Sequence, residues 1–194
     1  MRYMSLSLLL LLASAVHVCA QANSSSGYRV VNVNGKFGYA DANHIVIRPQ
    51  FDFARPFFDG MAAVAFSTDK PPQSDCSCGA VITMYHFKWG FINEAGELAI
   101  QPQWGDVGDF SEGLASVNNG EGFSFGKWGY ISKAGVLVIG SQFDEAGPFV
   151  NGKAPFVIRQ VVKGGTAIKF TRGYVDRRGK IKKLSQHVYQ SKPG

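Results

Sequence analysis

The sequence predicts an all-β protein, built as an array of about four β-meander repeats. Three observations support this fold class. A short Lys–aromatic–Gly–aromatic stretch recurs, a connector of constant length follows it, and apolar residues alternate at period two around both. The chain has 194 residues, 45% of them hydrophobic, so it is long enough to bury a sizeable core. Its 23 glycines show no Gly-X-Y period and are typical of short strands joined by turns.

The Lys–aromatic–Gly–aromatic stretch opens each predicted hairpin. It is complete at 36–39, 88–91 and 127–130, with phenylalanine in place of tryptophan in the first copy, and a reduced form occurs at 171–174. A turn residue follows each copy, and a short apolar run follows the first three turns, as expected for a hairpin with one buried face. The central glycine leaves room for a neighbouring aromatic ring or for a close backbone. The defining residues are Phe37, Gly38, Trp89, Gly90, Trp128, Gly129, Gly173 and Tyr174.

A connector of thirteen residues follows each of these apolar runs, at 48–60, 101–113 and 140–152. Aromatic residues match within it and each copy ends in glycine, as Phe110 and Gly113 illustrate in the second copy. The acidic or amide residue before that glycine marks a turn, and a strand of alternating character comes next. The unit is therefore predicted to be a three-stranded meander plus a connector, which gives about twelve strands in four units.

The segment between the alternating strand and the next hairpin varies in length. It is longest at 67–87, where an insertion contains Cys76 and Cys78. A fixed motif with one variable loop is how repeat arrays look in sequence. We predict one repeat domain over 28–184, with connectors on one side and variable loops on another. Such units are compatible with an open, curved or solenoid-like sheet, and equally with a closed barrel or propeller.

These motifs resemble those of the bacterial WG-repeat, or KWG-repeat, proteins over residues 35–184. The resemblance rests on Lys-Trp-Gly-Tyr-Ile at 127–131 and on FSEGLASV at 110–117. The first unit departs from the pattern with Phe37 in place of tryptophan, and the fourth departs with Arg172. The resemblance implies a β-rich repeat array, often exported, with no shared catalytic residue and a general role in binding or structural support.

Recurrence with the repeat guides the interpretation of single residues. Trp128 is interpreted as a packing residue of the core, and a stacking platform for a ligand is the alternative. Asp52 and Asp144 share a repeat position, and Asp106 lies one step further on. We interpret these carboxylates as parts of the turn and connector geometry rather than as a catalytic acid and base.

No catalytic residue, cofactor or metal site is predicted. His44 and His86 match no triad or metal spacing, although Cys76, Cys78 and His86 together would give three zinc ligands. In an oxidising compartment the two cysteines would instead form a small, strained disulfide or remain inert loop thiols. The sequence contains no glycine-rich phosphate loop, no Gly-x-Ser-x-Gly elbow and no His-Glu-x-x-His motif.

The N-terminal residues 1–22 have the features of a secretory signal peptide. Arg2 supplies a positive charge, an apolar run follows at 6–15, and Ala20-Gln21-Ala22 has the form of a cleavage site, with a cut after Ala20 as the alternative. The apolar run is too short to span a bilayer, so no transmembrane segment is predicted for the mature chain. We therefore expect a periplasmic or extracellular protein in which 23–27 form a short linker.

The net charge of +6 comes from the C-terminal residues. From 23 to 171 the chain has 12 basic and 13 acidic residues, so no nucleic-acid partner is expected. A basic run precedes the predicted tail at 185–194, and it would contact an anionic surface or form a Lys-rich edge strand that prevents further pairing, which is the interpretation we favour. The basic residues are Arg177, Arg178, Lys180, Lys182 and Lys183.

The sequence favours a non-catalytic binding or structural module over an enzyme. Its partner is expected to be a protein or glycan of the cell envelope, contacted above all by the insertion at 67–87. The alternative is an envelope hydrolase or glycan-active enzyme with a site in a groove between repeats, which would need His44 or His86 beside a nearby acid.

Overall fold

The computed structural model describes residues 17–18, 26–68, 87–120, 126–162 and 167–190. These residues form four antiparallel sheets of four strands each and no helix. The first sheet contains β1 (His17–Val18), β2 (Arg29–Val33), β3 (Lys36–Ala40) and β4 (Ile45–Phe51). The second contains β5 (Phe53–Phe58), β6 (Met61–Ser67), β7 (Phe87–Asn93) and β8 (Leu98–Trp104).

The third and fourth sheets repeat this plan. The third contains β9 (Asp106–Val107), β10 (Leu114–Asn118), β11 (Trp128–Ser132) and β12 (Leu137–Phe143). The fourth contains β13 (Glu145–Ala146), β14 (Lys153–Val161), β15 (Ala167–Asp176) and β16 (Ile181–Gln190). Strands adjacent in sequence are adjacent in each sheet, so every sheet is a simple meander.

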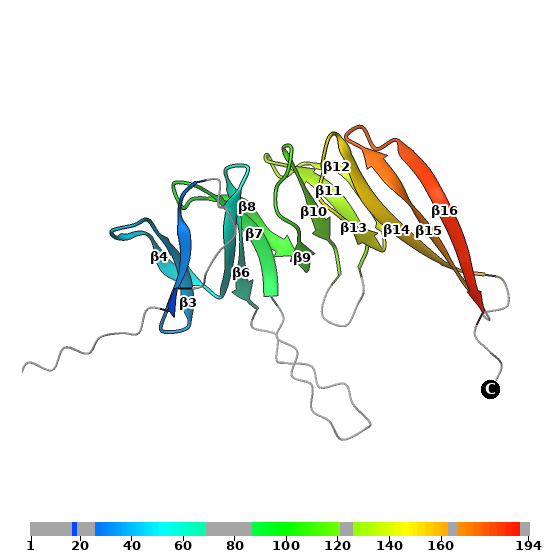
Figure 1. Cartoon of the computed structure of the whole chain (residues 1–194). Helices are drawn as coiled ribbons and strands as arrows, with labels where there is room; N and C mark the ends of the chain where they lie inside the picture. Colours follow the sequence, from blue (N-terminus) through cyan, green and yellow to red (C-terminus); the bar gives the residue numbers. More distant parts are fainter. Residues whose placement is uncertain (1–16, 19–25, 69–86, 121–125, 163–166, 191–194) are drawn as a thin grey trace, which may run out of the picture.

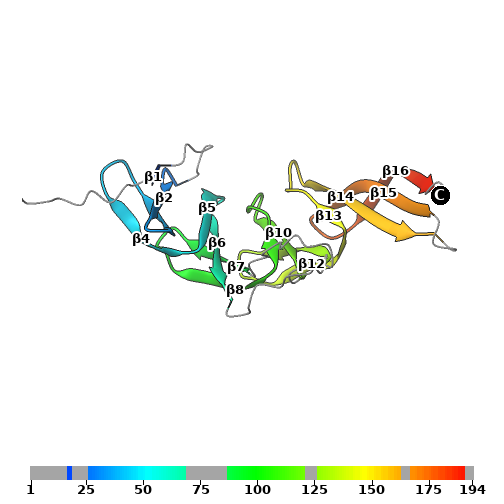
Figure 2. The ribbon, with the colours of Figure 1, turned by 90° about the horizontal axis from the view of Figure 1, so that it is seen from below.

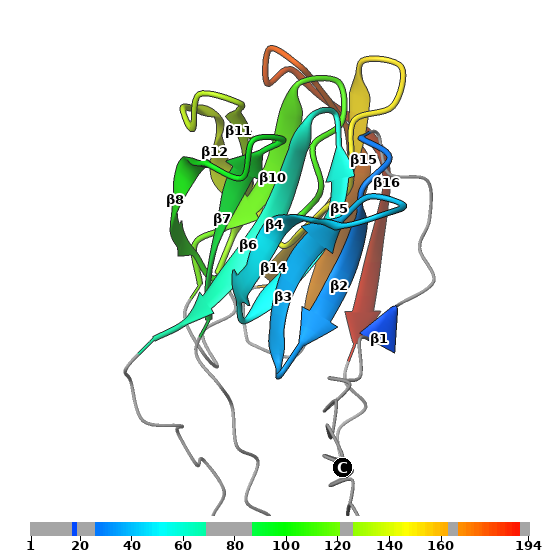
Figure 3. The ribbon, with the colours of Figure 1, turned by 90° about the vertical axis from the view of Figure 1, so that its left-hand side faces the viewer.

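The sheets follow one another as an open, curved row from the N-terminal to the C-terminal end (Figures 1 and 2). Viewed along the row, they lie one behind another with their faces apposed (Figure 3). The predicted all-β repeat array is confirmed, and of the two arrangements compatible with the sequence the open one is found. Within the described ranges there is no helix that could cross a membrane.

The predicted unit of three strands is wrong in both strand number and sheet boundaries. Each connector divides between two sheets, because β4 ends at Phe51 and β5 begins at Phe53. At the intervening Asp52, the backbone N–H already donates to Ala65 of the second sheet, at 3.0 Å. The second half of each connector therefore adds a fourth strand to the next sheet. Dividing the sequence into units by its motifs did not reveal this strand.

The inner sheets are buried on both faces. Along β6, Met61 and Ala63 pack in the core shared with the third sheet, whereas Ala62 and Val64 pack in the core shared with the first sheet. This explains why β6 reads as a nearly continuous apolar run, as strands covered on both faces do. A third core lies between the third and fourth sheets.

The boundaries of the array differ from the predicted ones at its C-terminal end. β16 pairs with β15 as far as Gln190, so the last strand runs beyond Leu184 into the predicted tail. At the other end, β1 lies inside the predicted signal peptide and pairs with β2. Cleavage after Ala22 would remove β1 and leave β2 as the edge of the first sheet.

Candidate binding face at the end of the sheet stack

The glycine after each aromatic residue is required by a close approach of the neighbouring backbone. A Cβ on Gly129 would lie 2.5 Å from the carbonyl oxygen of Ile139, and one on Gly90 would lie 2.4 Å from that of Ile100. The approach is close because the partner strand bulges: Trp128 pairs with Phe143, but Tyr130 already pairs with Ile139. Of the two roles left open by the sequence, space for backbone is the correct one.

The tryptophans lie at the rims of the cores. Trp89 and Trp128 are half-buried and pack against the apolar clusters from the side. The centre of each core is instead the aromatic residue after the glycine, and Tyr39, Phe91 and Tyr130 are at most 1% exposed. Packing is thus the role of Trp128, although it is not a fully buried core residue.

Each buried aromatic residue meets a phenylalanine of the next connector. The ring centroids are 4.8 Å apart for Tyr39–Phe57 and 4.9 Å for Tyr130–Phe149. The two tyrosine hydroxyls also donate to connector carbonyls at 2.8 Å, two residues before the phenylalanine in each case. Burial raises the pKa of both phenols above the ordinary value, so they remain neutral donors.

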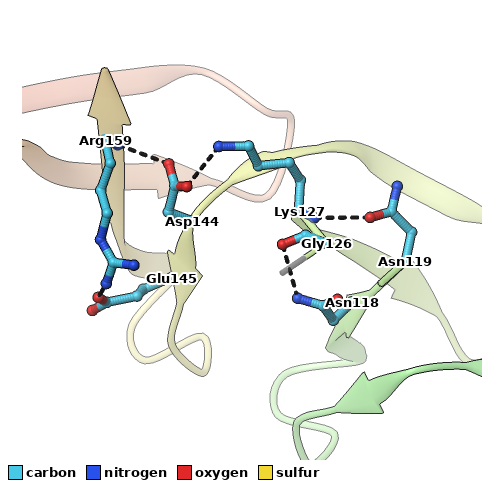
Figure 4. A network of polar contacts seen from close by, with 7 residues as sticks. All are labelled: Asn118, Asn119, Gly126, Lys127, Asp144, Glu145 and Arg159. Carbon is cyan, nitrogen blue, oxygen red and sulfur yellow. Dashed lines mark hydrogen bonds and ion pairs between the residues drawn. The ribbon is translucent and has the colours of Figure 1, made fainter. Parts of the chain in front are cut away.

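A lysine and an aspartate join the third sheet to the fourth (Figure 4). The Lys127 ammonium lies 2.6 Å from the Asp144 carboxylate, which also accepts the backbone N–H of Arg159 at 2.7 Å. Burial raises the pKa of Asp144, but these hydrogen bonds and the charge of Lys127 outweigh it and hold the pKa below its ordinary value. Lys36 and Asp52 make the same 2.6 Å contact between the first two sheets.

Residues of the connector turns join neighbouring sheets at the other end of the strands. The carboxylate of Asp59 accepts the N–H of Gly113 at 2.6 Å, and that of Glu112 accepts the N–H of Gly152 at 2.8 Å. Lys133 adds an ion pair to Asp59 at 2.8 Å. The carboxylates that recur with the repeat therefore have structural partners on the neighbouring sheet. We call the contact region between two consecutive sheets a junction and number the junctions from the N-terminal end.

One cluster does not recur and was missed from the sequence. The Arg55 guanidinium lies 4.6 Å from the centre of the Trp89 ring and donates to the carbonyl of Val107 at 2.7 Å. Asp106 lies 3.3 Å away, and Asp109 lies 3.9 Å away with a pKa that burial raises against the opposing effect of Arg55. Arg55 lies on the second sheet and its guanidinium donates to the third sheet. The cluster therefore belongs to the junction between these two sheets.

The outer face of the fourth sheet has no sheet packed over it. Tyr174 occupies the position of Tyr39 and Tyr130, yet it is 40% exposed. Tyr174 is exposed because in the described array no fifth connector covers it. A groove of about 530 Å³ lies here, and we call it the end-face groove; its lining includes Pro155, Val157, Arg172, Tyr174, Leu184 and Glu145.

The predicted basic residues lie in the turn before β16 and on β16, and Arg177 is directed away from the outer face, toward Gly113 of the third sheet. Arg177 and Arg178 are in the turn before β16, and Lys182 and Lys183 are on β16 itself, all exposed. β16 is an edge strand, as the favoured interpretation requires, but the array ends in a sheet face that this edge does not cover. Phe110 and Gly113, by contrast, lie in an inner junction.

The remaining candidates are not brought together. His44 is exposed and contacts only the neighbouring Asp41, at 3.2 Å, among the interactions of the described residues. Those residues also contain no group of three or more metal-ligating side chains. Cys76, Cys78 and His86 lie outside the described residues, so the disulfide and zinc hypotheses remain predictions.

A known protein family, described as WG containing repeat, matches the chain at residues 38–66, 89–123 and 128–160. The chain belongs to the WG-repeat family. No curated protein and no solved structure matches it in the corresponding comparisons.

The three matched WG repeats do not include β15 and β16. These strands carry the residues that depart most from the repeat, with Arg172 at the tryptophan position and Leu184 in the bulge opposite Arg172 and Gly173. The end-face groove is therefore lined on one side by residues outside the matched repeats, Arg172, Tyr174 and Leu184, and on the other by residues of the third matched repeat. In the sequence, the one sign of this groove was Arg172 at the position where other units have an aromatic residue. We interpreted it only as a departure of the last unit from the repeat.

Proposed function

We propose that this WG-repeat protein is an exported, non-catalytic binding module. In this proposal, the stacked sheets are the scaffold and the outer face of the fourth sheet is the principal binding surface. The observation that carries the proposal is the exposed end-face groove, lined by Tyr174 and Arg172 where every inner junction has a covering connector.

The distribution of polar contacts supports a scaffold role for the inner sheets. Asp52, Asp59, Glu112 and Asp144 each bind a backbone N–H or a lysine of a neighbouring strand or sheet. Side chains held in this way position the sheets relative to one another. A binding role requires only the exposed face.

Charge supports the same surface. The described residues of the fourth sheet and its turns include nine basic and two acidic residues. Apolar side chains are exposed among them, with Leu184 at 57% and Tyr189 at 60%. A surface that combines cations with exposed aromatic and aliphatic groups suits a partner that is both anionic and partly apolar.

Export is the part of the proposal that depends on the signal-peptide features of 1–22. It gives the module a protein or glycan partner in the envelope and a periplasmic or extracellular location. The insertion at 67–87 is a second contact region, because it interrupts the β6–β7 connection without changing the register of that strand pair.

This proposal is tested with the protein that begins at Asn23. The fraction of it that is retained on envelope fractions and on immobilised glycans is measured. Four proteins are compared: wild type, a deletion of 69–79, a variant with the five basic residues of 177–183 neutralised, and Arg172→Ala/Tyr174→Ala. We expect the last variant to lose retention and the deletion to reduce it at most partly. Loss only in the deletion would move the site to the insertion, and no retention of wild type would remove the support for a binding module.

A further inference from the structure

The inner junctions specify what fits over the aromatic residue that follows each WG glycine. In all three, a connector phenylalanine packs on this residue, with ring centroids 4.7 to 4.9 Å apart. Where the residue is tyrosine, its hydroxyl donates to the connector carbonyl two residues before that phenylalanine. An extended segment with a carbonyl at one residue and an aromatic ring two residues later therefore fits this position.

The fourth sheet presents the same position without the segment. Tyr174 is 40% exposed, and its hydroxyl makes no hydrogen bond among those of the described residues. Pro155, Leu184 and Arg172 line the end-face groove beside it. The sheet stands at the end of the row, where Figure 2 shows open space beyond its outer face.

Arg172 indicates the charge of the missing segment. It replaces the aromatic residue that precedes the glycine in the other units, and at the first junction that residue, Phe37, stacks on Phe53 of the connector at 5.9 Å. Phe53 lies two residues before Arg55, whose carbonyl accepts the tyrosine hydroxyl. A segment docked in the same way on the fourth sheet would place its equivalent residue against Arg172, where an acidic side chain would pair with the guanidinium.

We propose that the end-face groove binds an extended acidic segment of a partner protein with the pattern Asp/Glu-x-x-x-Phe. The acid contacts Arg172, the carbonyl two residues later accepts the Tyr174 hydroxyl, and the phenylalanine packs on the Tyr174 ring. The connectors of this chain already contain the pattern, at Asp106–Phe110 and Glu145–Phe149, but the phenylalanine of each copy is buried in an inner junction. The pattern names the partner class for the binding surface proposed above and rests on that proposal.

A peptide with the sequence of residues 105–113 is the probe. It is labelled with fluorescein and titrated with the chain from Asn23, and binding is followed by fluorescence polarisation. We expect saturable binding that weakens at least about tenfold with Arg172→Ala and about fivefold with Tyr174→Phe. Arg178→Ala removes the same charge outside the groove and is expected to change the affinity less than about twofold.

Peptide variants separate recognition from charge attraction. Replacing the residue equivalent to Phe110 by alanine, or scrambling the sequence, is expected to abolish saturable binding. Equal binding of the scrambled peptide would mean that the face attracts any polyanion and would overturn the proposal, as would no binding of the original peptide. In those cases the retention experiment decides about the proposed function. If retention on envelope fractions still depends on Arg172 and Tyr174, the chain is a binding module whose partner belongs to another class.

Discussion

The carbonyl oxygen of Ile139 makes glycine obligatory at position 129. The alanine Cβ in Gly129→Ala would lie 2.5 Å from that oxygen and 2.9 Å from the backbone nitrogen of Ser141. Backbone atoms cannot move aside as a flexible side chain does, so we expect this change to lower the free energy of unfolding by about 3 kcal/mol in urea denaturation.

Gly140→Ala is the matched control in the same hairpin. A Cβ at Gly140 meets no atom within 4 Å, and the expected change in the free energy of unfolding is within about 0.5 kcal/mol. Equal effects of the two substitutions would show that flexibility of the chain, rather than the close approach, explains the glycine of the WG motif.

Asp144 gives the stability of the third junction a pH dependence. Its pKa in the folded protein is held below the ordinary 3.8 by Lys127 and the Arg159 N–H, which outweigh burial. The folded state therefore binds fewer protons than the unfolded state as the pH approaches this range. The stabilisation is present above about pH 4 and is lost as the pH falls through the lowered pKa.

We expect Asp144→Asn to remove this contribution. The variant should be less stable than wild type at pH 7 by at most about 1 kcal/mol, because the Lys127 side chain is 43% exposed and water screens the pair. Urea denaturation from pH 2.5 to 7 should show the difference shrinking below pH 4. A difference that stays constant over this range would mean that the carboxylate charge is not what stabilises the junction.

The residue roles were only partly predictable from the sequence. Recurrence correctly indicated that Trp128, Asp52 and Asp144 serve the repeat, because repeated residues serve repeated geometry. It could not separate the half-buried Trp128 from the fully buried Tyr130, since both are aromatic residues of one strand. Tyr174 matches Tyr130 in sequence and differs only through the absence of a covering connector.

At the scale of the elements, the β6–β7 hairpin should form without the insertion. Ser67 and Phe87 are directly paired, so replacing 69–86 by Asn-Gly leaves a three-residue loop that can close the hairpin. We expect the melting temperature to stay within about 5 °C of wild type, because the entropy of loop closure depends only weakly on loop length. Failure of the shortened chain to fold would show that the insertion is part of the array.

Strand number was the main error of sequence interpretation at this scale. Hairpins and alternating strands were identified because their period-two pattern and turn residues are local. The second half of each connector was not recognised as a strand, since β9 and β13 have only two residues each. Their pairing is determined by contact with β10 and β14, which a local pattern does not record.

At the scale of the whole molecule, each apolar core among the described residues joins two consecutive sheets. In such a row, stability is a sum of sheet and junction contributions, and one junction can open without the others. Phe149→Ala removes a ring that is 1% exposed at the third junction, and we expect a loss of about 3–4 kcal/mol there.

Hydrogen exchange locates the effect of Phe149→Ala. Amide protection should fall in β14, β15 and β16 and remain unchanged in β2, β3 and β4, because the first sheet shares no contact with the third junction. A uniform loss of protection along the chain would contradict the open row and favour a single cooperative core.

The choice between an open and a closed array was beyond the sequence. Four equal meanders with equal connectors satisfy the local pattern in either arrangement. The difference depends on whether the last face meets the first, which is a contact between residues at opposite ends of the chain. The exposed Tyr174 and the end-face groove follow from the open arrangement.

Exposure of Tyr174 in solution tests the central claim most directly, because the open row, the uncovered face and the binding proposal all require it. The chain would be labelled with 3-fluorotyrosine, its fluorine resonances assigned by Tyr→Phe substitutions, and a soluble paramagnetic agent added. We predict strong broadening of the Tyr174 resonance and little effect on those of Tyr39 and Tyr130, which are 40%, 0% and 0% exposed respectively. A Tyr174 resonance as protected as that of Tyr130 would contradict the account, since the end face would then be covered.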